Sequence, residues 1–171
     1  NLSGITSMSG GAYFSLALRN DSTVWGWGAN WDGYIGDGTS IDRIEPVKTL
    51  NLNGIVAVAA GEYHSMALKS DGTVWAWGWN GDGELGDSTT TVRTTPVKVK
   101  NLSGVIAIAA GSRFSLALKN DGTVWGWGQN SNGQLGDSTT IGKLYPVQVK
   151  NLTGISKISA EAISSTEEKP S

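Results

Sequence analysis

Residues 101–150, NLSGVIAIAAGSRFSLALKNDGTVWGWGQNSNGQLGDSTTIGKLYPVQVK, decide the fold, because the chain repeats them. Residues 1–50 and 51–100 carry the same pattern in the same register, without insertion or deletion, and residue 151 opens a further copy that is soon lost. A period of about 50 residues predicts a propeller, a solenoid or an array. The chain therefore divides into repeats at 1–50, 51–100 and 101–150, the start of a fourth at 151–159 and a degenerate tail at 160–171.

Each copy predicts four strands. In the third copy, residues 104–111 alternate branched and small side chains, and their row of alanines fits the narrow centre of a propeller. Residues 114–118 form a second strand, and the Asn-Asp-Gly turn at 120–122 joins it to a third at 123–128. After a long polar loop, residues 146–149 predict a short outer strand. Without helical periodicity, the sequence indicates an all-β fold.

The first copy departs from the turn pattern. Ser22 stands where the other two copies have glycine, the residue that accepts a positive φ without penalty. We therefore expect strain or a different turn at Asp21-Ser22, with the hairpin itself retained.

Composition excludes several classes of partner and site. The net charge is -2, with 13 Lys and Arg against 15 Asp and Glu and no basic run, so nucleic acid is not an expected partner. No apolar run reaches the 18 residues of a membrane span. The absence of cysteine excludes disulfides, thiolate zinc sites and a cysteine nucleophile, and it leaves the compartment open.

Candidate chemical groups are few, and each has a structural interpretation. His64 is the single histidine, and both sister copies have Phe at its position, so we expect a packed core ring. Asp37, Asp87 and Asp137 recur in every copy, which favours a loop hydrogen bond over a metal site, since a site is normally built once. No phosphate-binding loop or nucleophile elbow is present. We predict no enzyme activity, no cofactor and no metal.

Positions at which the three copies carry different residues are not constrained by the fold of the repeat. Aromatic and acidic residues occupy several of them in the loops, and such residues on a rigid platform are typical hot spots for a protein partner. The alternative is packing between adjacent loops. The candidate partner-binding residues are Trp31, Tyr34, Trp79, Asp32, Asp82 and Glu84.

Four linked motifs of the second copy carry a resemblance. They are GEYHSMAL at 61–68, DGTVWAWG at 71–78, GELGD at 83–87 and PVKV at 96–99. In this order they resemble the repeat of the regulator of chromosome condensation family. The resemblance implies a β-propeller of four-stranded blades, seven in a complete member. The Val-Trp-x-Trp-Gly spelling is similar to bacterial members, among them the secreted propeller that inhibits β-lactamases, so a secreted location is one option.

Three blades and one extra strand at 155–159 do not close a ring. We therefore expect a fragment of a longer propeller, or an arc that closes with other copies of itself through its blade faces. The first functional hypothesis is a non-enzymatic module that binds a protein through loop aromatics on one face. The alternative is a self-assembling unit. A third, guanine nucleotide exchange as in the founding family member, has no matching motif here.

Overall fold

The computed structural model describes residues 2–160, which form twelve β-strands in three sets of four. The first repeat supplies β1 (Ile5–Gly10), β2 (Phe14–Arg19), β3 (Val24–Gly28) and β4 (Arg43–Lys48). The second supplies β5 (Ile55–Ala60), β6 (His64–Lys69), β7 (Val74–Gly78) and β8 (Arg93–Lys98). The third supplies β9 (Val105–Ala110), β10 (Phe114–Lys119), β11 (Val124–Gly128) and β12 (Lys143–Gln148).

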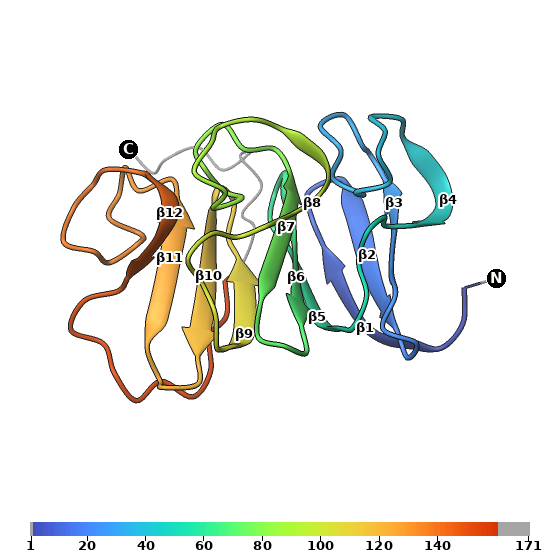
Figure 1. Ribbon diagram of the computed structural model, residues 1–171. Helices are drawn as coiled ribbons and strands as arrows, with labels where there is room; N and C mark the ends of the chain where they lie inside the picture. Colours follow the sequence, from blue (N-terminus) through green and yellow to red (C-terminus); the bar gives the residue numbers. More distant parts are fainter. Residues whose placement is uncertain (1, 161–171) are drawn as a thin grey trace, which may run out of the picture.

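Each repeat folds into one four-stranded antiparallel sheet with its strands in chain order. The three sheets stand side by side, with β5–β8 between the other two (Figure 1). They are three blades of a partial propeller, which confirms the all-β fold predicted from the repeat. We call the sheets β1–β4, β5–β8 and β9–β12 blade 1, blade 2 and blade 3. Within the described residues, no helix has the length and apolarity that a membrane span requires.

The hydrophobic core lies between the blades. Side chains alternate across a strand, so each sheet has two different faces. The aliphatic face of blade 1 packs against the face of blade 2 that carries alanine and tryptophan. In the same way, the aliphatic face of blade 2 packs against the alanine and tryptophan face of blade 3. The first interface contains Phe14, Leu16, Leu18, Val24, Ala67 and Trp77. The second contains Met66, Leu68, Val74, Leu85, Ala117 and Trp127.

The turn between β2 and β3 of blade 1, which has Ser22, has the same hydrogen bond as the turn of blade 2, which has Gly72. Ser22 has a φ of 62°, and its N–H donates to the carbonyl of Arg19 at 2.9 Å. Gly72 has a φ of 77° and donates to Lys69 at 3.0 Å. The hairpin is retained, as expected, and the serine occupies a left-handed conformation that disfavours a side chain.

Residues 151–160 follow the last blade. The Ile155 N–H donates to the carbonyl of Gly122 at 3.2 Å, in the same way that Val105 donates to Gly72 at 3.1 Å. The segment thus begins where the first strand of a further blade would begin. Residues 155–160 nevertheless pair with no strand among the residues that the structure describes. Most of the predicted degenerate tail, residues 161–171, lies outside those residues.

Candidate protein-binding surface

The long loop between the third and fourth strands of each blade is organised around a buried asparagine. The Asn30 side chain is fully buried and donates to the Asp37 carboxylate at 3.1 Å and to the carbonyls of Thr39 and Ile41 at 3.0 and 3.2 Å. Its oxygen accepts from the Ile35 N–H at 2.9 Å. Asn80 and Asn130 make the same bonds in the other blades. The hydrogen bonds of its own buried asparagine therefore hold each loop in place.

The recurrent aspartates serve this loop, as expected from their repetition. Asp137 accepts from the N–H and hydroxyl of Thr139 and lies 3.2 Å from the Lys143 ammonium. The Thr139 hydroxyl and the Lys143 ammonium outweigh the effect of burial and lower the pKa of Asp137 to about 2. Asp37 and Asp87 make the equivalent bonds. Within residues 2–160, no three acidic or histidine side chains gather as a metal site would require.

Two aromatic side chains of blade 1 are exposed at the end of the sheet where the first turn and the long loop lie together. Tyr13 and Trp31 are each 56% exposed, with ring centroids 5.6 Å apart. In blade 2, Trp79 is 36% exposed. Its indole lies over Gly81, where a Cβ atom would be 2.5 Å from the ring. Two loops of neighbouring blades thus present indoles to solvent.

Tyr34 was predicted to bind a partner as a loop aromatic outside the blade core, but it lies in the core between two blades. Its side chain is only 2% exposed, and its ring stacks on Phe14 at 5.3 Å and contacts Tyr63 of the next blade at 6.1 Å. The hydroxyl donates to the Asp32 carboxylate at 2.8 Å. Burial, with this hydrogen bond to a carboxylate, raises the pKa of Tyr34 above its usual range. The Tyr34 ring therefore packs edge-on against the Trp31 ring, with ring centroids 6.5 Å apart, and its hydroxyl holds the Asp32 carboxylate in place.

Glu84 was also expected at the surface, and it is fully buried. Its carboxylate folds back over its own loop and accepts from the Asp82 N–H at 2.9 Å, while the other oxygen has no partner in the described part of the chain. Burial raises the pKa of Glu84 to about 7. The neighbouring Asp82 is partly exposed and lies 3.7 Å from Arg113 of blade 3.

The residues available to a partner are therefore Tyr13, Trp31, Asp32, Trp79 and Asp82, which we call the loop surface. Tyr13 is not among the candidate residues predicted from the sequence, although the difference between this position and its counterpart Arg113 was a usable signal. The two halves of the surface are connected through Tyr63, whose ring contacts Tyr34 and whose carbonyl accepts from the Trp79 N–H at 2.9 Å.

His64 is a core ring, as the sequence predicted. It is 1% exposed, and its Nε2 lies 2.9 Å from the Ser115 hydroxyl of blade 3. Burial lowers the pKa of His64 to about 4, so the ring is neutral at physiological pH. The Ser115 hydroxyl in turn donates to the backbone carbonyl of Glu84, which makes it a packing group between blades rather than a nucleophile.

Three four-stranded blades in chain order, with loops held by a repeated Asn and Asp pair, define the class of propeller repeat proteins. Comparison with protein families identifies the particular repeat. The description "Regulator of chromosome condensation (RCC1) repeat" matches residues 21–68, 71–118 and 121–162, and a second description of this repeat matches 5–33, 55–84 and 105–134. The chain belongs to this family, which confirms the resemblance found in the motifs. A search of curated protein sequences finds no match.

Solved structures agree with the assignment. Prp20p from Saccharomyces cerevisiae, which binds Gsp1p and histones, is 25% identical and superposes with a TM-score of 0.74 over 88% of this chain. Human WBSCR16 is 28% identical, with a TM-score of 0.76 over 84% of this chain. In both cases the chain spans only 39% of the relative's length.

Proposed function

We propose that this protein is a non-enzymatic module that binds another protein through the loop surface. The observation that carries the proposal is the exposure of Trp31 and Trp79 on loops that are rigidly held. Trp31 contacts Tyr13 and Tyr34, and Trp79 lies over Gly81, yet 56% and 36% of their respective surfaces stay exposed. Trp and Tyr are also the residues that dominate the binding energy of protein interfaces.

Rigidity supports the proposal. The buried Asn30 closes its loop through bonds to backbone carbonyls, so Trp31 projects from a fixed base. Side chains that are already fixed lose less conformational entropy when a partner binds. The same asparagine in blade 2, Asn80, precedes Gly81 and fixes the loop under Trp79.

The charges of the loop surface indicate the kind of partner. Asp32 is held in place by the Tyr34 hydroxyl, and Asp82 is partly exposed beside Arg113. Aromatic rings with carboxylates at their edge fit a partner that offers an apolar patch with lysine or arginine around it. Prp20p, which binds Gsp1p and histones, gives a precedent for protein binding by a similar fold.

The experiment is a binding measurement with two kinds of probe: a histone mixture, and peptides selected from a displayed library on the immobilised chain. We expect Trp31→Ala and Trp79→Ala each to weaken binding by roughly tenfold or more, which corresponds to a hot-spot residue. Tyr145→Ala is the matched control, since this tyrosine is 51% exposed on β12 and outside the loop surface. Equal binding by all three variants would overturn the proposal.

Guanine nucleotide exchange remains the less favoured function, because no feature of the described residues supports it beyond family membership. Self-association through the blade faces is the second candidate function. It rests on different residues from the loop surface.

A further inference from the structure

The chain contains three Asn-Gly pairs, at residues 53–54, 80–81 and 132–133. An asparagine before glycine can be attacked by the next backbone nitrogen, because glycine has no side chain to keep that nitrogen away from the amide carbon. Asparagine is for this reason one of the thermolabile residues of proteins. The three pairs share one sequence but lie in different environments, so the structure decides which of them reacts.

The reaction has two steps and needs only water. The glycine nitrogen attacks the side-chain carbonyl carbon of the asparagine and closes a succinimide ring, and the amide nitrogen leaves as ammonia with the proton of the glycine N–H. Water then adds to one of the two ring carbonyls and breaks its bond to nitrogen. Opening at the side-chain carbonyl gives aspartate, whereas opening at the backbone carbonyl gives isoaspartate. No atom is oxidised or reduced.

Asn80 is protected by its own hydrogen bonds. The side chain is fully buried, and its amide nitrogen donates to the carbonyls of Thr89 and Thr91 at 3.0 and 3.1 Å. The Trp79 indole also covers Gly81, so water would have to enter beneath the ring. Formation of the succinimide would break the bonds that hold the loop. Asn80 therefore stays intact, and with it the loop that carries Trp79.

Asn132 is exposed, but the nitrogen that would attack it already has a partner. The Gly133 N–H donates to the carbonyl of Asn130 at 2.9 Å and closes a turn. The Asn132 N–H donates to the Gln134 side chain at 3.0 Å, which fixes the same turn from the other side. Gly133 would have to break its hydrogen bond, and open the turn, to reach the amide carbon. Asn132 is therefore held in an unreactive arrangement.

Asn53 has neither form of protection. Its side chain is exposed and makes no hydrogen bond within residues 2–160, and the Gly54 N–H has no acceptor there either. The space around the glycine is open, since a Cβ atom on it would meet nothing closer than the Ser70 hydroxyl at 3.4 Å. The pair lies in the crossover between β4 and β5, outside both strands. Nothing in the described structure keeps the nitrogen away from the amide carbon.

The turn does not require an asparagine at this position. Gly54 has a φ of 64°, and its carbonyl accepts from the Ser70 N–H at 2.9 Å. In the third repeat Ser103 takes the place of the asparagine, yet Gly104 has a φ of 69° and accepts from the Asn120 N–H at the same distance. The backbone thus has the same form with either residue.

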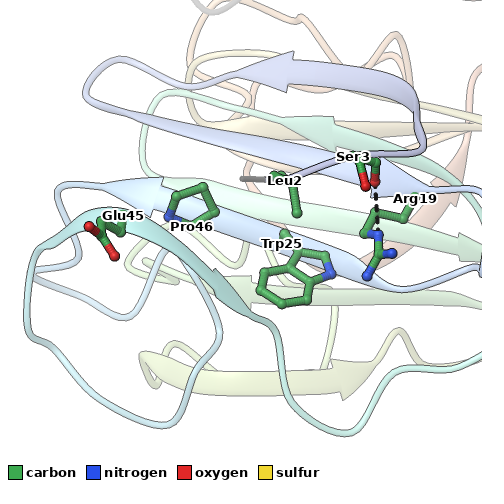
Figure 2. Close-up of a pocket in the computed structure, with 6 residues that line it drawn as sticks. All are labelled: Leu2, Ser3, Arg19, Trp25, Glu45 and Pro46. Atoms are coloured by element: carbon green, nitrogen blue, oxygen red, sulfur yellow. Dashed lines mark hydrogen bonds between the residues drawn. The ribbon is translucent and has the colours of Figure 1, made fainter.

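Blade 1 gives a second example of a serine in this turn. Ser3 is the counterpart of Asn53, and its backbone carbonyl accepts from the Arg19 side chain at 3.1 Å, beside Trp25 (Figure 2). The serine hydroxyl takes no part in this bond. A short side chain is therefore sufficient here in two repeats, and the asparagine of the second repeat adds reactivity without a structural role.

We infer that Asn53 is a modification site, which converts by itself to aspartate and isoaspartate with water as reactant and ammonia as leaving group. The folded chain selects this residue from three identical pairs, because it alone combines an exposed amide with a glycine N–H that has no acceptor in the described residues.

The two products have different effects on the contact between blades 1 and 2. Aspartate keeps the path of the main chain and adds a carboxylate at the end of the sheet where β6 ends at Lys69. Isoaspartate lengthens the main chain by one methylene group just before Ile55, whose side chain is 1% exposed in the core between the blades. The Ile55 N–H also donates to the Ser22 carbonyl of blade 1 at 3.4 Å. Isoaspartate therefore displaces the start of β5 and loosens this interface.

The test is to age the folded chain at mildly alkaline pH and to map its peptides by mass spectrometry. Chromatography separates the aspartate and isoaspartate forms of each peptide. The same chain in guanidinium chloride is the control, because all three pairs are then equally accessible and should convert at similar rates. In the folded chain we expect conversion at Asn53, with Asn80 and Asn132 still unchanged when half of the molecules have reacted.

Two variants test whether the turn itself confers the reactivity. Asn53→Ser copies the third repeat and should abolish conversion without a change in fold, which circular dichroism checks. Ser103→Asn should create a second reactive pair with Gly104. We also expect the aged unmodified chain to develop a fraction that unfolds at lower temperature, and aged Asn53→Ser to develop none.

An Asn53 that stays unchanged in the folded chain overturns the inference, and so does conversion of Asn80 or Asn132 at the same rate. A folded Ser103→Asn variant that does not react overturns it as well, since its turn has the same geometry. None of the substituted residues belongs to the loop surface, so the result is independent of the proposed function.

Discussion

Trp127 donates its indole N–H to the backbone carbonyl of Glu84, 2.7 Å away in the preceding blade. Trp27 has the same sequence context, but it is partly exposed and its indole N–H has no acceptor among the described residues. The same residue type thus joins two blades at one position and makes no such bond at the other.

Replacing these two tryptophans should show what the hydrogen bond between blades contributes to stability. Trp127→Phe removes an indole and a buried hydrogen bond, and we expect it to lower the free energy of unfolding by roughly 2 kcal/mol. Trp27→Phe should change the free energy of unfolding by less than about 0.5 kcal/mol, because its indole N–H has no acceptor among the described residues. Urea titrations of both variants measure the two changes. Equal effects of the two substitutions on unfolding would contradict this assignment of roles.

Ser22→Gly should stabilise the protein by about 1 kcal/mol, because glycine accepts the positive φ of this turn without a Cβ penalty. The reverse change, Gly72→Ser, is the control. It should be destabilising, since a Cβ atom there would also lie 3.2 Å from the Gly104 nitrogen. Thermal and urea unfolding measure both. A neutral Ser22→Gly variant would show that the serine is not strained.

Glu84 predicts a pH-dependent stability. Burial raises its pKa from an ordinary value of 4.5 to about 7, so the folded protein binds more protons than the unfolded chain between these two values. The free energy of unfolding therefore contains a contribution that falls as the pH rises from about 4.5 to 7 and is constant above that range. Glu84→Gln removes it, so the variant should gain stability relative to the unmodified protein across this interval. A difference that does not change with pH would rule out a buried, titrating carboxyl.

The blades were predictable from the sequence because their signals are local. Alternation with period two and the Asn-Asp-Gly turn at 120–122 specify a hairpin within a few residues of each other. The repeat then transfers the prediction from one copy to the others. The expected core position of His64 followed from the same comparison, because phenylalanine fills that position elsewhere.

The candidate site was predicted only in part, because burial of the loop residues depends on the next blade. Tyr34 and Glu84 are buried where a following blade covers them, whereas Gln134 at the same position of the last blade is only half-buried. The sequence of one repeat does not indicate whether another blade packs against it. Trp31 and Trp79, which the sequence put among the candidate partner-binding residues, are 56% and 36% exposed, and their role in binding stays a prediction.

The buried asparagine of each long loop has a consequence for how such a protein can change over evolutionary time. Asn30 closes its loop through backbone carbonyls and one aspartate, and it uses neither of the side chains at positions 31 and 32 for this purpose. Mutations at these two positions can therefore accumulate without loss of the fold. Each blade added by duplication brings a new tip of this kind, so recognition can diversify independently of architecture.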